Sequence, residues 1–280
     1  MNTEVSNFLA SHPYSEATKT TYARVLEELA QLDLTNWNAR DLLVFIERDS
    51  WGNSWRCAAL YACRAFIRWK HGATHPALSA KIKRTKPKAH RSLNYDQVIS
   101  LLSSFDTYTP SGARDQAILA TALDTGFRVS ELARIQLADM DLERGTIQTI
   151  IKGGQWGFGF FSAETAVILD RWISYRRDIT KCGALFITLK ENKRRGSQMK
   201  AQGIQTLFKR WGMKAGFKLS PHDARRSFAT LSTENGAPSR VLQSAGRWSD
   251  IKMVERYTAN LNGQAVKPFL PMANLSNRKS

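Results

Sequence analysis

The chain contains one segment that no folded core could hold. Residues 81–91 read KIKRTKPKAHR, with six Lys or Arg residues, one proline and no acidic residue. Burial would strip these cations of their hydration without supplying counter-charges. We therefore predict an exposed basic linker at 81–91 between two folded parts, residues 1–80 and residues 92–280. The charge density suits a phosphate backbone, although a solvated tether between domains would have the same composition.

The chain as a whole is strongly basic. Its 280 residues include 41 Lys and Arg against 24 Asp and Glu, which gives a formal net charge of +17. Hydrophobic residues make up 42% of the sequence, enough for folded cores in both parts. A chain this basic most often has a polyanionic partner, and nucleic acid is the first candidate. On charge alone, a protein that is merely basic and soluble is the alternative.

Several features predict a cytoplasmic protein. No apolar run approaches the roughly 20 residues that a membrane-spanning helix needs, and the N-terminal residues lack the basic start and apolar core of a signal peptide. The three cysteines, Cys57, Cys63 and Cys182, include no Cys-x-x-Cys pair, which is typical of a reducing compartment. We therefore expect a cytoplasmic protein with no membrane partner.

The hydrophobic pattern predicts a mainly α-helical chain with a small antiparallel β-sheet in its second part, an α+β fold. Ser15 is a favourable N-cap for the helix that follows it. The alternating, β-branched residues 145–151 predict a strand, and 158–162 its partner in a hairpin. We expect helices at 15–32, 40–47, 54–69, 95–105, 112–123, 129–137, 164–177, 201–214, 223–234, 239–245 and 250–259, a further short strand at 184–188 and a polar loop at 190–200.

The chain lacks the common signatures of nucleotide and metal sites. It contains no GxxxxGK[ST] phosphate loop and no GxGxxG after a strand. None of its five histidines is paired with cysteine or carboxylates at a ligand spacing. We therefore expect no cofactor and no metal ion. Any cleavage of nucleic acid would have to stabilise the reacting phosphate with side chains.

Phosphoryl transfer without a metal ion needs three kinds of group. Cations must hold the non-bridging oxygens, an acid must protonate the leaving oxygen, and a nucleophile must lie in line. Arginine suits the first task because its planar fork binds phosphate bidentately, lysine or histidine suits the second, and tyrosine can be the nucleophile. The chain offers Arg128 at a helix start after Gly126, Lys152 at the end of the predicted strand, His222 and Arg225 on one helix face, and Tyr257 on a short polar helix.

This ordered set resembles the tyrosine recombinase or phage integrase family, which includes Cre and the Xer recombinases. The family pattern is Arg, Lys, His-x-x-Arg, His or Trp, and then Tyr. TGFRVSELARI at 125–135 and PHDARRSFAT at 221–230 match its two arginine blocks. Trp248 stands nine residues before Tyr257, at the family spacing for the His or Trp position, and Glu131 matches an acidic residue that the family often carries beside the site.

The sequence departs from the family pattern at three places. The hairpin IKGGQWGFGFF lacks the second basic residue of the usual GKGxKxR and gains aromatic residues. Arg226 stands where the commonest box has a histidine. Gly246, Arg247 and Trp248 replace the usual Leu-Gly-His, and the spacing to Tyr257 aligns Trp248 with the catalytic position.

The resemblance implies a site-specific recombinase built from a helical core-type DNA-binding domain at 1–80 and a catalytic domain at 92–280 with a C-terminal tail. It implies that Tyr257 forms a 3′-phosphotyrosyl link, that Arg128, His222 and Arg225 balance charge, and that Lys152 protonates the leaving oxygen. Trp248 would buttress the site and Glu131 would orient a neighbour. The basic residues expected to contact DNA are Lys81, Lys83, Arg84, Lys86, Lys88, Arg91, Arg226 and Arg247.

The partners implied by the resemblance are double-stranded DNA with paired core sites and further copies of the chain. A homotetramer would act on DNA through a Holliday junction, and the free protein would be a monomer or a weak oligomer. No small-molecule substrate is expected. Phe269 and Leu270, between two prolines of the tail, are candidates for docking on a neighbouring subunit, with intramolecular packing as the alternative.

Two other functions remain open from the sequence. An enzyme resembling a type IB topoisomerase would cleave and rejoin one strand as a monomer, relaxing supercoils without exchanging flanking DNA. A catalytically silent DNA-binding protein of the same fold would give footprints without a covalent adduct.

Overall fold

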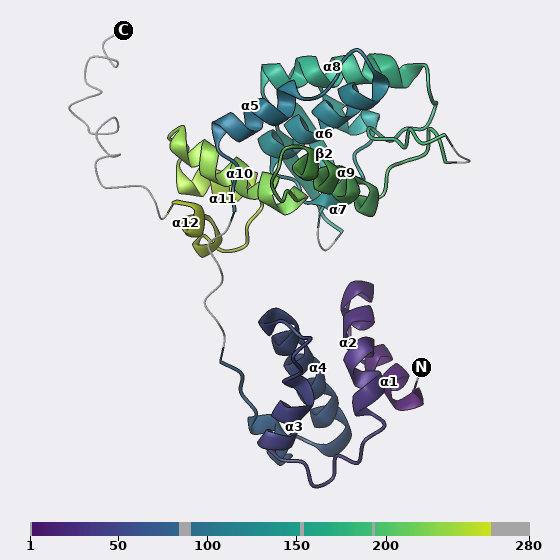
Figure 1. The fold of residues 1–280 in the computed structure, drawn as a ribbon, viewed down its shortest axis with the longest axis vertical. Coiled ribbons are helices and arrows are strands. Elements are labelled where there is room, and N and C mark those ends of the chain that lie inside the picture. The colour runs from purple at the N-terminus through teal and green to yellow at the C-terminus, as the bar shows by residue number, and fades with distance from the viewer. Residues whose placement is uncertain (1, 84–90, 152–153, 192–193, 259–280) are drawn as a thin grey trace, which may run out of the picture. The chain divides into compact units, whose positions relative to one another are not determined.

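The computed structural model describes residues 2–83, 91–151, 154–191 and 194–258. The chain divides into two compact units, Met1–Lys88 and Ala89–Ser280 (Figure 1). The division falls within the basic segment 81–91. Within the described ranges, no helix is both long enough and apolar enough to span a bilayer.

The first unit is helical. Ser15 caps its second helix, as predicted, by accepting a hydrogen bond from the Thr18 amide. The apolar side of the longest helix, with Cys63, Phe66 and Ile67 buried, packs into a core that also holds Phe8 and Leu26. The elements are α1 (Thr3–Ala10), α2 (Glu16–Leu29), α3 (Ala39–Ile46), α4 (Asn53–His71) and a 3₁₀ turn at Pro76–Ser79.

Burial of Cys63 has a measurable consequence. Its side chain is fully buried, and this burial raises the pKa of the thiol from 9.0 to about 12. We expect iodoacetamide at pH 8 to alkylate Cys57 and Cys182, which are part-exposed, while Cys63 reacts only after denaturation. Peptide mass spectrometry would measure the three rates, and alkylation of Cys63 in the native chain as fast as Cys57 would contradict this.

The same shift sets a pH dependence for the first unit. Because the thiol pKa is higher in the folded state than its ordinary value, the contribution of Cys63 to stability is fully present below pH 9. It is lost as the pH rises from there towards about 12.

The second unit combines helices with one small sheet, so the predicted α+β class is confirmed. Three antiparallel strands run in the order β1-β2-β3, and Ile147 and Thr149 pair with Gly159 and Gly157. The helices are α5 (Tyr95–Ser103), α6 (Pro110–Thr125), α7 (Val129–Leu132), α8 (Ala163–Arg177), α9 (Ala201–Lys214), α10 (Pro221–Glu234), α11 (Ser239–Ala245) and α12 (Lys252–Thr258), and the strands are β1 (Met140–Asp141), β2 (Thr146–Ile150) and β3 (Trp156–Phe160).

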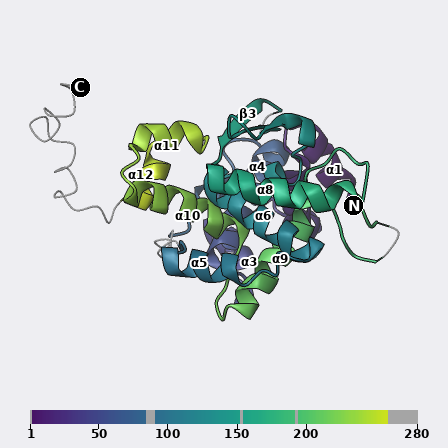
Figure 2. The same ribbon diagram turned by 90° about the horizontal axis from the view of Figure 1, so that it is seen from above.

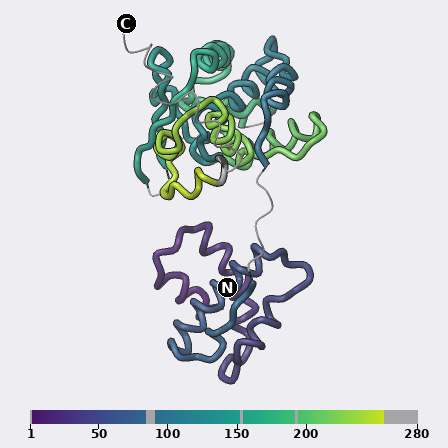
Figure 3. Tube along the Cα trace, turned by 90° about the vertical axis from the view of Figure 1, so that its left-hand side faces the viewer, coloured from purple at the N-terminus to yellow at the C-terminus, as the bar shows by residue number. Residues whose placement is uncertain are grey.

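Helix α6 forms the centre of this unit. It is buried along most of its length and packs against α8 and α10 (Figure 2). The surrounding core holds large side chains such as Phe127, Trp172 and Phe208, and the Trp172 indole donates to the Leu185 carbonyl at 2.9 Å. The last helices, α10 to α12, pack on one another around Phe228, Leu242 and Val254 (Figure 3).

Three sequence predictions were wrong. The helix expected at 129–137 is a single turn, Val129–Leu132, because Ile135 enters the core and Gln136 forms an isolated bridge with Ala184. The strand expected at 184–188 makes only two isolated bridges. The strand predicted at 158–162 lies two residues earlier, because Trp156 pairs with Ile150 and begins β3. Helix α1 was not predicted. Strand β1 was also missed, because two residues are too few to show an alternating pattern.

Candidate active site

The first turn of α10 presents the predicted histidine and arginine at different depths. Ser220 caps the helix together with Asp223, and Pro221 occupies the first turn. His222 is exposed, whereas Arg225, one turn later, is only 3% exposed. The helix therefore carries an accessible imidazole above a buried guanidinium.

Arg225 joins three segments that are distant in sequence. One terminal nitrogen donates to the carbonyl of Gly126, which follows α6. The other donates to the carbonyl of Gly246 at 2.5 Å, which follows α11. The guanidinium carbon lies 4.5 Å from the ring centroid of Trp248, a cation–π geometry. This arginine is consequently fixed in position, with its charge at the junction of α6, α10 and α11.

Glu131 holds the other predicted arginine. Its carboxylate accepts from the Arg128 amide at 2.8 Å and from the Arg128 guanidinium at 2.9 Å. Glu131 is 1% exposed, while 41% of the Arg128 side chain remains accessible. The carboxylate thus fixes the direction of Arg128 from beneath and leaves much of the guanidinium open to a ligand.

Arg128, His222 and Arg225 line one pocket of about 440 Å³. The sequence analysis did not include Lys209, an exposed residue of α9 that adds a further cation. No acidic residue is among the nine that line it. Its remaining lining residues are Val129, Gln205, Leu219, Ser220 and Pro221. A pocket with three cationic side chains and a histidine is suited to an anion such as a phosphodiester.

Trp248 lies behind the pocket. It is 8% exposed and stacks on Phe228, with ring centroids 6.1 Å apart and planes inclined by 17°. Tyr257 belongs to α12, which packs against α10 and α11, but the structure does not describe its side chain. Lys152 lies outside the described residues.

The residues expected to contact DNA differ in placement. Lys81, Lys83 and Arg91 are exposed, and Arg91 donates to the Lys218 carbonyl at 2.8 Å. Arg226 is half-buried and pairs with Asp223 at 3.3 Å. Arg247 faces inward, with 9% of its side chain exposed, which does not fit a direct contact to DNA. Arg84, Lys86 and Lys88 lie outside the described residues.

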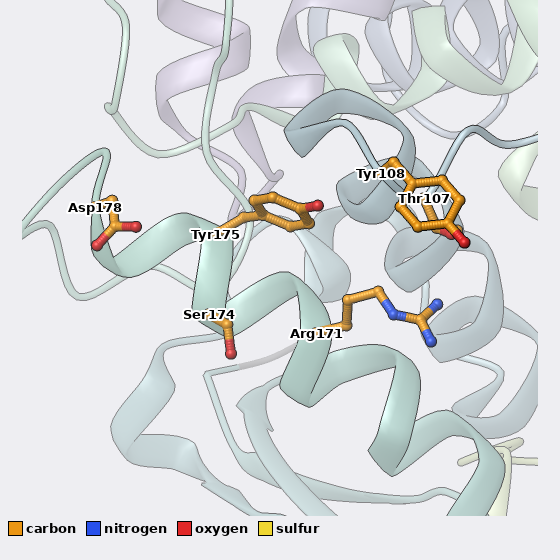
Figure 4. Close-up of a pocket in the computed structure, with 6 residues that line it drawn as sticks. All are labelled: Thr107, Tyr108, Arg171, Ser174, Tyr175 and Asp178. Atoms are coloured by element: carbon orange, nitrogen blue, oxygen red, sulfur yellow. The ribbon is translucent and has the colours of Figure 1, made fainter.

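A second pocket, of about 530 Å³, lies between α8 and the loop before α6 (Figure 4). Arg171, Ser174, Tyr175 and Asp178 line it from α8 and its C-terminal end, and Thr107 and Tyr108 from the loop. It contains none of the predicted catalytic residues. In the part of the chain that the structure describes, no three His, Cys, Asp or Glu side chains gather as metal ligands.

Gly126 permits the close approach of these segments. Its φ of +58° is left-handed, and a Cβ here would lie 2.5 Å from a Phe228 ring carbon. We expect Gly126→Ala to lower the free energy of unfolding by about 1–2 kcal/mol through the backbone and by about 1–3 kcal/mol more through overpacking. Urea denaturation would measure the loss. Gly216→Ala is the matched control because its φ is +77° and nothing lies within 4 Å, so an equal loss in both variants would exclude the Phe228 clash.

Comparison with known proteins gives consistent matches. The model of the phage integrase family matches residues 91–263. The chain is 32% identical over 195 residues to tyrosine recombinase XerD of Listeria innocua, covering 65% of this chain and 62% of that relative. It is 25% identical over 285 residues to XerC of Actinobacillus pleuropneumoniae, covering 92% and 91%. The Tn1549 transposon integrase, solved in complex with transposon right end DNA, has a similar fold, with a TM-score of 0.73 and 18% identity over 97% of this chain and 99% of that one.

Proposed function

Because this chain belongs to the phage integrase family of DNA breaking and rejoining enzymes, we propose that it is a site-specific recombinase acting on double-stranded DNA. The observation that carries the proposal is the shared pocket that brings Arg128 together with His222 and Arg225 of the distant helix α10. Lys209 adds a cation, and the pocket lining has no acidic residue to repel a phosphate. The DNA complex of the similarly folded Tn1549 integrase supports DNA as the partner.

In the proposed reaction, the Tyr257 oxygen forms a bond to the scissile phosphorus while the bond to the 5′ oxygen breaks. His222, exposed at the pocket, accepts the tyrosine proton, and Lys152 gives a proton to the leaving 5′ oxygen. Arg128, directed by Glu131, and Arg225, backed by Trp248, stabilise charge on the non-bridging oxygens. Lys209 adds to this positive field. A 5′-hydroxyl from a second strand then reverses the step and conserves the bond energy.

The assembly is also a proposal. Two sites would pair in a homotetramer, and strands would exchange through a Holliday junction. The helical unit at 1–88 and the exposed Lys81, Lys83 and Arg91 would hold the DNA backbone electrostatically, together with Arg226 and the basic residues Arg84, Lys86 and Lys88. A protein with this substrate would work in the cytoplasm, at the nucleoid.

The test starts without a known DNA site. Cells that carry the native locus would express the chain, be lysed in denaturant, and yield protein-linked DNA whose ends are sequenced. Recurrent ends with the protein on the 3′ phosphate are expected, and a plasmid with two copies of that sequence should then exchange flanking DNA. Relaxation of supercoils without exchange would instead favour the topoisomerase-like function, and footprints without any adduct would favour a silent DNA-binding protein.

A further inference from the structure

Arg247 has a backbone conformation that its residue type disfavours. It follows α11 with φ of +56° and is the only non-glycine residue with positive φ among those that the structure describes. A left-handed conformation costs a side-chain-bearing residue about 1–2 kcal/mol. Such a conformation persists only where surrounding contacts hold it in place, so the contacts of this side chain are informative.

The Arg247 guanidinium binds the middle of one strand and the C-terminal ends of two helices. It donates to the Phe158 carbonyl of β3 at 2.5 Å and to the Ala245 carbonyl of α11 at 2.6 Å. It also donates to the Thr125 carbonyl, at the end of α6, at 3.1 Å. Its central carbon lies 4.4 Å from the Phe127 ring centroid. One side chain therefore connects the edge strand β3 to the C-terminal ends of α6 and α11.

Strand β3 is shaped to accept this side chain. Its two inward positions are Gly157 and Gly159, while its aromatic residues face outward. A Cβ at Gly157 would lie 2.5 Å from Ile151 Cγ2 and 3.0 Å from Arg247 Cδ, and one at Gly159 would lie 2.6 Å from Phe127 Cζ. The glycines of this strand, unusual for a strand interior, thus leave room for Arg247 and Phe127.

The same guanidinium lies beside the carboxylate that orients Arg128. The closest approach between Arg247 and Glu131 is 3.8 Å. Burial lowers the pKa of Arg247 to about 10, partly opposed by the Glu131 charge. The side chain is consequently still cationic at neutral pH. Its strongest contacts are nevertheless to main-chain carbonyls, above all to β3.

We propose that Arg247 is a positioning residue that holds the β2–β3 hairpin against the end of α6. The inference rests on the proposed function, because the segment joining β2 to β3, residues 151–155, contains Lys152, the group assigned to protonate the leaving oxygen. Arg247 touches no reacting atom in this role. Its contribution is to hold β2 and β3, the strands on either side of that segment, in place against the end of α6.

A change of leaving group isolates this role. Single-turnover cleavage would be measured on the mapped site with either the normal 5′ oxygen or a bridging sulfur at the scissile bond. A thiolate leaves without protonation, since thiols have a pKa of about 8.5.

Arg247→Gly is the variant for this test, because it removes the side chain and glycine readily adopts the left-handed backbone conformation. We expect this variant to cleave the normal substrate roughly 10–100-fold more slowly, because a small displacement of a catalytic group has an effect of that size. On the sulfur substrate it should cleave at nearly the wild-type rate. Its affinity for DNA should not change. Lys152→Ala should show the same pattern.

Two further variants keep the test decisive. Gly157→Ala places a methyl group against both Ile151 and Arg247, so it should displace the hairpin while keeping the arginine, and it should reproduce the sulfur rescue. Arg240 is an exposed arginine of α11 whose guanidinium donates to the Gln243 side chain at 3.1 Å. Arg240→Ala should cleave both substrates normally. Equal losses on both substrates would overturn the proposal in favour of a role in charge balance. A loss confined to DNA affinity would overturn it in favour of direct DNA contact, and unchanged cleavage would overturn it outright.

Hydrogen exchange on the DNA-free protein tests separately whether Arg247 holds the hairpin in place. The amides of β3 should exchange faster in Arg247→Gly than in wild type or Arg240→Ala, and equal exchange would contradict the proposed anchoring. If the wild-type chain cleaves neither substrate, the proposed function fails. The exchange measurement would still show whether Arg247 holds the hairpin.

Discussion

Tyr257→Phe is expected to abolish covalent attachment to DNA while leaving binding intact. The substitution removes one oxygen, and no phenyl carbon can attack phosphorus. Loss of the nucleophile in covalent enzymes costs on the order of 10⁴–10⁶ in rate. Denaturing gels of the chain with its mapped, end-labelled site would show a protein–DNA band for wild type and none for the variant. Gel shifts should give matching affinities.

Tyr108→Phe is the matched control for this experiment. Tyr108 is 91% exposed and lines the separate pocket beside α8 (Figure 4). It should form the adduct at the wild-type rate. A persistent adduct in Tyr257→Phe would assign the nucleophile to another residue and would remove the basis for aligning Trp248.

The fold was largely predictable because most elements carry local signals. Helices α9 and α11 begin and end where the periodicity predicts. The errors lie where tertiary contacts override local pattern. Residues 133–137 have helical propensity, but Gln136 bridges to Ala184 and Ile135 is needed in the core. Short elements such as β1 offer too few residues for any periodicity.

The residues of the site could be predicted from the sequence, but their positions relative to one another could not. Arg128, His222 and Arg225 stand in recognisable local motifs, and the structure brings them to one pocket. Lys209 was missed because a lysine on the polar face of an amphipathic helix carries no local signal of a site. Arg247 was predicted to contact DNA, but its side chain faces inward. Two features of the sequence could have indicated that this side chain faces inward. One is the pair of glycines in β3, and the other is that Arg247 replaces the glycine of the usual Leu-Gly-His motif.

Arg225→Lys is expected to be the most damaging change that preserves charge in the pocket. Lysine cannot donate to the Gly126 and Gly246 carbonyls in the same planar arrangement, nor stack on Trp248 as a guanidinium does. We expect single-turnover cleavage to fall about 10²–10³-fold, the usual effect of losing one donor to a transition-state oxyanion. A buried acceptor left without a donor should also cost about 1–3 kcal/mol of stability.

Arg114→Lys separates the loss of chemistry from the loss of stability. Arg114 is also buried in the second unit, where it binds Asp115 at 2.6 Å and lies outside the pocket of Arg128, His222 and Arg225. Its replacement should lower the free energy of unfolding by a similar amount, yet cleavage measured well below both melting temperatures should stay close to wild type. If the two variants lost activity in parallel, Arg225 would matter only as a structural link between α6 and α11. If Arg225→Lys alone lost cleavage, its guanidinium would be acting on the phosphate.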